Sequence, residues 1–152
     1  MAGPSPEFKP LLDAGALPLT DSSELRFYVD EFKGHKFASI RTFLKGGNYT
    51  GPTKAGVTFN AEILESIVAA LEKLPKDPAG LGEQELGRYP KRPGTELVAR
   101  ITIFKDAPGL DIREWVEDAT YKGWSKKGVR IPYKDAAQAA AFLKEMRKAI
   151  AK

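Results

Sequence analysis

The sequence contains an internal repeat with a period of 72 residues, and this feature limits the possible folds more than any other. Residues 25–74 align with residues 97–146 without a gap. Self-similarity at a fixed period indicates two copies of one structural unit. Chance similarity between two basic segments is the alternative, and the matched glycines argue against it. Twelve positions are identical in the two copies: Leu25/Leu97, Phe32/Phe104, Lys33/Lys105, Ile40/Ile112, Arg41/Arg113, Tyr49/Tyr121, Gly51/Gly123, Lys54/Lys126, Gly56/Gly128, Val57/Val129, Ala69/Ala141 and Leu71/Leu143.

The segment between the copies has the composition of a linker. There are four prolines and four glycines in residues 75–94, PKDPAGLGEQELGRYPKRPG. Both residue types are typical of turns and loops rather than of helices and strands. The opening MAGPSPEF reads as a flexible arm or a tag. We therefore expect an N-terminal arm or tag at 1–21, a first repeat at 22–74, a Pro/Gly-rich linker at 75–96 and a second repeat at 97–152.

Each copy begins with strand patterns and ends with a helix pattern. Leu25, Phe27 and Val29 alternate with outward residues, as in a half-buried strand. Further strands are expected at 35–44, near Tyr49 and at 57–59, followed by Asn60 as a helix N-cap. Apolar residues then recur at helical spacing in both copies: Leu64, Ile67, Val68, Leu71 and Leu74, and Ala136, Ala139, Ala140, Leu143 and Met146. The expected fold is α+β, with two tandem ββββα repeats, each an antiparallel four-stranded sheet with one face under its helix.

Strand alternation predicts which side chains lie on the open face of each sheet. Because Ile40 and Ile112 occupy core positions, a cation and a ring two residues apart face outward in each copy. These pairs are Arg41 with Phe43 and Arg113 with Trp115. The neighbouring strands add Tyr28, Phe32, Thr58, Arg100, Phe104 and Arg130. Basic turns at Lys54 and at Lys126–Lys127 flank this face.

Rings and cations on one face favour single-stranded nucleic acid as the ligand. Aromatic side chains stack on bases with about 1–3 kcal/mol per base, and lysines contact phosphates. A duplex hides the faces of its bases, so unpaired strands fit better. The formal net charge of +4 favours a polyanion only weakly. Two other interpretations remain open: the rings are buried where two sheets pack, and Arg113 pairs with Glu117 on the same face.

These residues resemble a known family. The runs EFKGHKFASIRTF with GPTKAGVTFNAEIL, and FKDAPGLDIREW with KKGVRIP, are similar to the single-stranded-DNA-binding domain of the positive-cofactor-four (p15) transcriptional coactivators. The opening LRFYVDEF is similar to Pur-alpha repeats, and Whirly proteins belong to the same superfamily. The resemblance implies curved sheets that dimerise through their helices. Two fused copies would then form an intramolecular pseudo-dimer: a monomer with an internal pseudo-two-fold, with further assembly possible.

The resemblance also implies a binding surface, to which strand alternation adds Arg130. The predicted nucleic-acid-binding residues are Lys33, Lys36, Arg41, Phe43, Lys54, Lys105, Arg113, Trp115, Trp124, Lys126, Lys127 and Arg130. The copies differ within this surface, since Lys36 corresponds to Pro108, Gly34 to Asp106, Thr42 to Glu114 and Pro52 to Trp124. The implied partners are single-stranded DNA, with RNA as a second candidate, and transcription or replication machinery.

Other function classes find little support in the sequence. The chain has no cysteine, its single histidine, His35, lies in a predicted turn, and the acidic Asp111, Glu114, Glu117 and Asp118 alternate between two faces. We therefore expect no enzyme, no metal and no cofactor. No apolar run approaches the roughly 20 residues that span a bilayer, and no leader pattern is present. We expect a cytoplasmic, nucleoid-associated protein, or a nuclear one in a eukaryote.

The main rival is a protein–protein interaction module that acts as a transcriptional cofactor without touching nucleic acid. In that case the exposed rings bind a polymerase or another protein, and the charge only aids solubility. The sequence leaves both this choice and the choice between DNA and RNA open.

Overall fold

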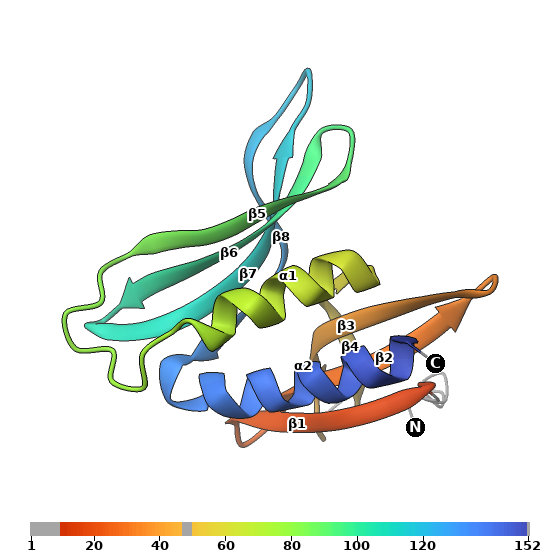
Figure 1. Ribbon diagram of the computed structural model, residues 1–152, viewed down its shortest axis with the longest axis horizontal. Helices are drawn as coiled ribbons and strands as arrows, with labels where there is room; N and C mark the ends of the chain where they lie inside the picture. The colour runs from red at the N-terminus through yellow and green to blue at the C-terminus, as the bar shows by residue number, and fades with distance from the viewer. Residues whose placement is uncertain (1–9, 47–49, 152) are drawn as a thin grey trace.

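The computed structural model describes residues 10–46 and 50–151 and contains two four-stranded antiparallel sheets, each followed by a helix (Figure 1). The first repeat consists of β1 (Leu12–Thr20), β2 (Ser23–Phe32), β3 (His35–Leu44), β4 (Gly51–Phe59) and α1 (Ala61–Glu72). The second consists of β5 (Gln84–Arg92), β6 (Thr95–Phe104), β7 (Ala107–Glu117), β8 (Lys122–Pro132), a 3₁₀ turn η1 (Tyr133–Asp135) and α2 (Ala136–Ala151). The α+β class and the tandem ββββα order are confirmed.

Strand pairing follows the 72-residue repeat through both sheets. Each sheet has its strands in chain order, β1-β2-β3-β4 and β5-β6-β7-β8. Ala38 pairs with Phe59 in the first sheet, and Leu110 pairs with Ile131 in the second. The ladder irregularities also correspond, since the register shifts between Arg41 and Phe43 and again 72 residues later. The gapless alignment therefore reflects two sheets with the same hydrogen-bonding register.

The expected arm and the expected linker each contain a strand, so the sequence interpretation was wrong there. β1 lies within residues 1–21 and β5 lies within residues 75–96. Both are edge strands, where Pro18 and Pro90 are tolerated because one side of the strand needs no ladder donor. Bulges next to Gly15 and Gly87 break the alternation that would have marked the strands.

The last strand of each sheet is longer than its pattern indicated. β4 runs the whole way from Gly51 to Phe59, rather than over 57–59 alone. The short strand expected near Tyr49 falls on residues 47–49, which lie outside the described part of the chain. Four strands precede each helix as expected, but β1 takes the place of one of the predicted short strands.

Both helices form where the apolar spacing predicts them. The Oδ1 atom of Asn60 accepts a hydrogen bond from the N–H of Ile63 at 2.9 Å, which confirms the predicted cap of α1. Its buried face comprises Ile63, Leu64, Ile67, Val68 and Leu71. The buried face of α2 comprises Ala136, Ala139, Leu143 and Met146. Neither helix in the described part of the chain is long and apolar enough to cross a membrane.

The helices do not simply cover their own sheets, as the sequence led us to expect. Helix α2 of the second repeat packs on β1, β2 and β3 of the first sheet, while α1 contacts β5 of the second sheet as well as β3 (Figure 1). The ring of Phe142 on α2 lies 5.1 Å from that of Phe27 on β2. Small alanines on α2 allow this close approach.

The exchange gives the two repeats one continuous core. This core contains buried residues of both sheets and both helices. The helices pack against each other, with ion pairs from Lys144 to Glu72 and from Arg147 to Glu65 at 3.4 and 3.6 Å. The two sheets also meet directly, because β4 contacts β8.

The packing of α2 on β1 predicts a destabilising effect at Gly15. This glycine has a φ of +150°, and a Cβ atom there would overlap the ring of Phe142. We expect Gly15→Ala to lower the free energy of unfolding by about 1–3 kcal/mol, measured by urea denaturation. Gly82→Ala is the control, because a Cβ there meets open space. Equal midpoints for wild type and Gly15→Ala would contradict this packing.

Candidate functional site

The faces of the two sheets that point away from the helices carry the predicted arginine pair in matching positions. Arg41 lies opposite Gly56, and Arg113 lies opposite Gly128. A Cβ atom at either glycine would come under 3.0 Å from the arginine side chain. The repeated glycines therefore let each arginine lie flat across the neighbouring strand.

Each arginine donates a hydrogen bond across its sheet to a backbone carbonyl. Nη1 of Arg41 donates to the Thr53 carbonyl at 2.9 Å, and Nη1 of Arg113 donates to the Ser125 carbonyl at 3.2 Å. The remaining partners differ, because Arg41 Nε meets the Tyr28 hydroxyl at 3.3 Å whereas Arg113 Nη2 meets a carboxylate of Asp111 at 3.4 Å. Neither guanidinium is therefore a free phosphate ligand.

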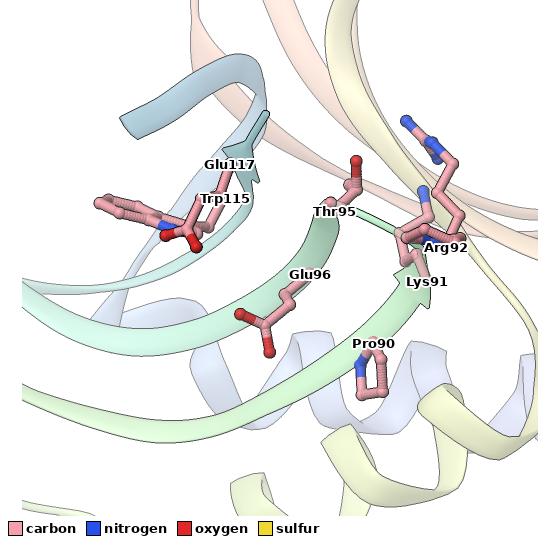
Figure 2. Close-up of a pocket in the computed structure, with 9 residues that line it drawn as sticks. Pro90, Lys91, Arg92, Thr95, Glu96, Trp115 and Glu117 are labelled. Atoms are coloured by element: carbon pink, nitrogen blue, oxygen red, sulfur yellow. The ribbon is translucent and has the colours of Figure 1, made fainter. Parts of the chain in front are cut away.

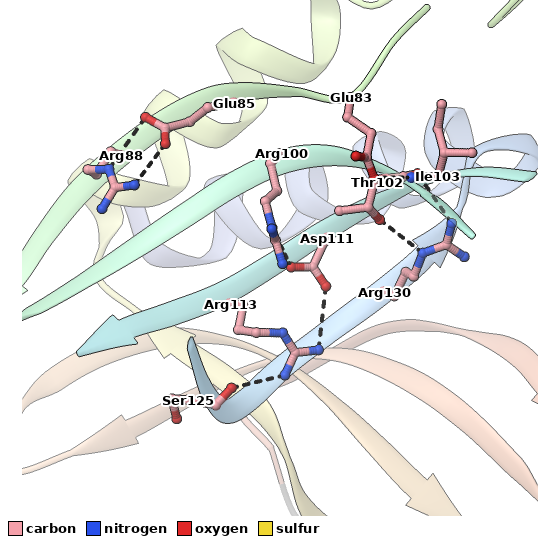
Figure 3. A network of polar contacts seen from close by, with 10 residues as sticks. All are labelled: Glu83, Glu85, Arg88, Arg100, Thr102, Ile103, Asp111, Arg113, Ser125 and Arg130. Atoms are coloured by element: carbon pink, nitrogen blue, oxygen red, sulfur yellow. Dashed lines mark hydrogen bonds and ion pairs between the residues drawn. The ribbon is translucent and has the colours of Figure 1, made fainter. Parts of the chain in front are cut away.

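The outer face of the second sheet carries a charged network (Figure 3). The buried Asp111 accepts from Arg100 at 3.1 Å and from Arg113. Arg130 lies over Gly109 and donates to the hydroxyl of Thr102 at 3.1 Å. The alternative in which Arg113 pairs with Glu117 is not observed, since Arg113 pairs with Asp111 and Glu117 pairs with Lys122 at 3.4 Å.

The equivalent part of the first sheet is neutral. Ser39 takes the place of Asp111, and its hydroxyl lies 3.0 Å from the Thr58 hydroxyl. Tyr28 takes the place of Arg100 and bonds Arg41. The two outer faces share a backbone plan, but the first sheet has its ion pairs at Arg26 and Glu24, 2.6 Å apart, and none at the position of Asp111.

Trp115 and Trp124 form a pair on the outer face of the second sheet. Their ring centroids are 4.8 Å apart at an interplanar angle of 79°. The guanidinium carbon of Arg100 lies 3.8 Å from the centroid of Trp124, and that of Arg88 lies 5.8 Å from the centroid of Trp115. Both indoles are half-buried, so each keeps some accessible surface. The outward position that alternation predicts for Trp115 is confirmed.

The corresponding ring of the first sheet is covered, so the expected exposure of Phe43 is wrong. Phe43 is only 4% exposed and Tyr28 only 6%. The two rings meet edge to face at 6.1 Å, and the guanidinium carbon of Arg26 lies 4.9 Å from the Phe43 centroid. Position 98 in the second sheet, equivalent to Arg26, is Val98, which is too short to cover Trp115 in this way.

Two exposed rings lie at the hairpin ends, as alternation predicted. Phe32 and Phe104 are 64% and 63% exposed. The Nζ atoms of Lys33 and Lys105 lie 5.3 and 5.4 Å from the centroids of these rings. Both lysines have positive φ angles, 52° and 51°, which direct the chain through the tight turn. Each hairpin therefore presents one ring and one ammonium group together.

The other predicted lysines lie mostly at ladder irregularities within β4 and β8, so the basic turns expected at Lys54 and at Lys126–Lys127 are wrong. Lys54 follows the point where β4 leaves regular pairing, and Lys126 and Lys127 lie at the equivalent point of β8. All three side chains are exposed, while Lys36 at the start of β3 is half-buried.

Two cations outside the predicted binding surface, Lys91 and Arg92, also lie near the tryptophan pair. The sequence interpretation assigned them to the linker. They lie at the end of β5 and line a hollow of about 630 Å³ with Pro90, Thr95, Glu96, Trp115 and Glu117. Figure 2 shows Trp115 on one side of this hollow and Lys91 with Arg92 on the other. The 72-residue offset, carried back from residue 97, would have located this strand, because Gly15/Gly87, Pro18/Pro90 and Glu24/Glu96 also match.

The acidic residues of β7 and the following turn each have a separate structural partner. Glu114 is buried and accepts from Lys91 Nζ at 2.8 Å. The backbone N–H groups of Thr120 and Tyr121 donate to Asp118 at 2.8 Å and hold the pKa of its carboxyl below the ordinary value. Within residues 10–46 and 50–151, no group of three or more His, Asp or Glu side chains could hold a metal ion.

The network predicts that Asp111 stabilises the outer face of the second sheet. Asp111→Ala leaves Arg100 and Arg113 without their carboxylate, and we expect about 1–3 kcal/mol less free energy of unfolding. Glu117→Ala removes an exposed carboxylate of the same strand and should cost less than about 0.5 kcal/mol. Chemical denaturation of both variants measures the difference. An equal decrease in the free energy of unfolding for both variants would show that the contacts of Asp111 stabilise the sheet no more than an exposed ion pair does.

Comparison with known proteins finds a similarity that covers most of the first repeat. Residues 19–70, from the end of β1 into α1, match the family described as Transcriptional Coactivator p15 (PC4). A crystal structure of WHY3 from Arabidopsis thaliana is also similar, with a TM-score of 0.48 and 8% sequence identity over 97% of this chain and 91% of that chain. A comparison with curated proteins gives no match. The resemblance expected from the sequence is confirmed for the first repeat.

Proposed function

We propose that this protein binds single-stranded nucleic acid, DNA in preference to RNA, because residues 19–70 match the family described as Transcriptional Coactivator p15 (PC4). Bases stack on aromatic rings of the sheets and hairpins, while lysines and arginines contact phosphates. The function served is regulation of transcription or maintenance of DNA. The observation that carries the proposal is the tryptophan pair flanked by Arg88 and Arg100 on a sheet face without a helix.

The rings supply the sequence-tolerant part of the binding energy. Trp115 and Trp124 stand edge to face, so a base can stack on the accessible face of one indole while the other holds that indole in place. Stacking of this kind contributes about 1–3 kcal/mol per base. Phe32 and Phe104 provide further accessible faces at the hairpin ends. A duplex offers none of its base faces, which favours unpaired strands.

The first sheet contributes less stacking than the family resemblance implies. Phe43 is covered by Arg26 and packed against Tyr28, so it supports the face instead of meeting a base. In this proposal the first repeat therefore contacts the strand through the ring of Phe32 and through its lysines. The second repeat is the main stacking surface in this proposal.

The lysines supply the phosphate contacts. Lys33 and Lys105 lie at the hairpin ends, and Lys36 lies near the start of β3. Lys54, Lys126 and Lys127 project from the irregular stretches within β4 and β8. Arg41, Arg113 and Arg130 already donate to carbonyl groups, so they hold the strands together and add positive potential. Contacts of this kind make affinity fall as salt rises.

Tryptophan fluorescence tests the proposal directly, since Trp115 and Trp124 are the only tryptophans. We expect single-stranded DNA to quench the emission at low salt, RNA to quench it more weakly, and duplex DNA to have the least effect. Trp115→Leu should weaken binding about 5- to 100-fold, whereas Trp115→Phe, which keeps a ring, should lose less. Circular dichroism checks that both variants fold. Absence of quenching by either single strand would contradict the proposal and favour the protein-interaction module.

The helix packing supports a second part of the proposal, a monomer with an internal pseudo-two-fold. Because α1 and α2 of one chain bury their apolar faces together, the surface that would otherwise join two chains is already occupied. Light scattering of the free protein should give the mass of one chain. A stable two-chain mass across dilution would contradict this part while leaving the strand-binding part intact.

A further inference from the structure

A cleft between the two sheets is lined by five cations and one carboxylate. Arg41, Lys54, Gly56 and Thr58 come from the first repeat, and Lys91, Arg92, Glu114 and Lys127 come from the second. Its volume is about 350 Å³. We call it the junction cleft. We infer that it binds one phosphate group of the single strand, an inference that rests on the proposed function.

Most of the positive charge in the junction cleft is uncompensated. Glu114 accepts hydrogen bonds from Lys91 at 2.8 Å and from Arg92 at 3.4 Å, so one negative charge is shared between two positive charges. Lys54 and Lys127 form no ion pair within the part of the chain that the structure describes, and the carboxylate that Arg41 acts on, Asp30, does not line the cleft. Five cations against one carboxylate leave four positive charges facing one cleft. A phosphate group is the common cellular anion that matches both this charge and the fork of an arginine.

The fold holds the second repeat's side of the cleft in place. The side chain of Glu114 is only 5% exposed, and that of Lys91 only 15%. A buried ion pair fixes geometry more than it adds stability. Here it anchors the end of β5, so that Arg92, with 53% of its side chain exposed, extends from a fixed base. Figure 2 shows Lys91 and Arg92 side by side and directed away from Trp115.

The same arrangement is missing from the equivalent residues of the other repeat. The positions 72 residues before Lys91, Arg92 and Glu114 are Leu19, Thr20 and Thr42. None of these three side chains carries a charge. The basic hairpin end of the second repeat, with its buried carboxylate, therefore has no charged counterpart in the first repeat.

The junction cleft continues from the proposed stacking surface. Lys91 and Arg92 line both this cleft and the hollow that contains Trp115. A strand with one base on Trp115 can therefore place a neighbouring phosphate at Arg92 and pass on toward Lys54 of the first sheet. The site joins the two repeats into one binding track that runs across a single junction.

The salt dependence of binding tests the junction cleft. The variant Arg92→Thr introduces the residue of the equivalent position, Thr20, and removes one exposed cation. With a fluorescent oligothymidylate, the slope of log affinity against log salt should decrease by about 0.7, the value for one phosphate contact of a single strand. Lys148→Thr is the matched control, because it removes the same charge from α2, where the side chain is 70% exposed, and should leave the slope unchanged.

A second variant tests whether both repeats hold the same phosphate. Lys54→Thr should also lower affinity, and the double variant Lys54→Thr/Arg92→Thr should lose less than the sum of the two single losses. If the wild type binds the strand but Arg92→Thr keeps the slope of Lys148→Thr, the inference is wrong and the proposed function stands. If the wild type binds no single strand, the proposed function itself fails. Additive losses would place Lys54 and Arg92 on separate phosphates and overturn a shared site.

Discussion

The apolar face of α2 packs on the sheet of the other repeat, and the rest of the structure depends on this contact. Leu143 and Met146 are fully buried, and Phe142 meets Phe27 of the first sheet. The first sheet thus draws most of the cover of its inner face from the second repeat. The exchange brings β4 beside β8 and leaves both outer faces without a helix. Hydrophobic burial on one side of each sheet therefore leaves the polar side accessible to solvent.

The duplication kept the backbone and diversified the outer surface. Both sheets have the same register and the same arginine lying over a glycine. The first sheet adds a covered ring and neutral hydroxyl pairs, while the second adds a tryptophan pair, an ionic network around Asp111 and a basic hairpin at Lys91. In an assembly of two identical chains, both halves would have to carry the same side chains. Fusion of the copies removes that constraint, and the outer faces of the two halves carry different side chains.

Sequence patterns predicted the parts of the fold that depend on local spacing. The α1 cap at Asn60, the buried helix faces, the outward Trp115 and the exposed Phe32 and Phe104 all follow from periodicity within one element. The edge strands β1 and β5 were missed because bulges at Gly15 and Gly87 interrupt alternation and because proline is usual in loops. Phe43 was misplaced for another reason: its cover comes from Arg26 on the adjacent strand, and alternation carries no information about a neighbour's length.

The sequence by itself determined the repeat, the helix that ends each copy and the faces on which apolar side chains lie, since these follow from residue spacing along one segment. Only the tertiary structure decided which helix covers which sheet and which cations meet. Lys91 and Arg92 lie far along the chain from Arg41 and Lys54, yet they share one cleft because the exchange of helices sets β4 against β8. Such a meeting depends on packing between distant segments, and no period within either segment encodes it.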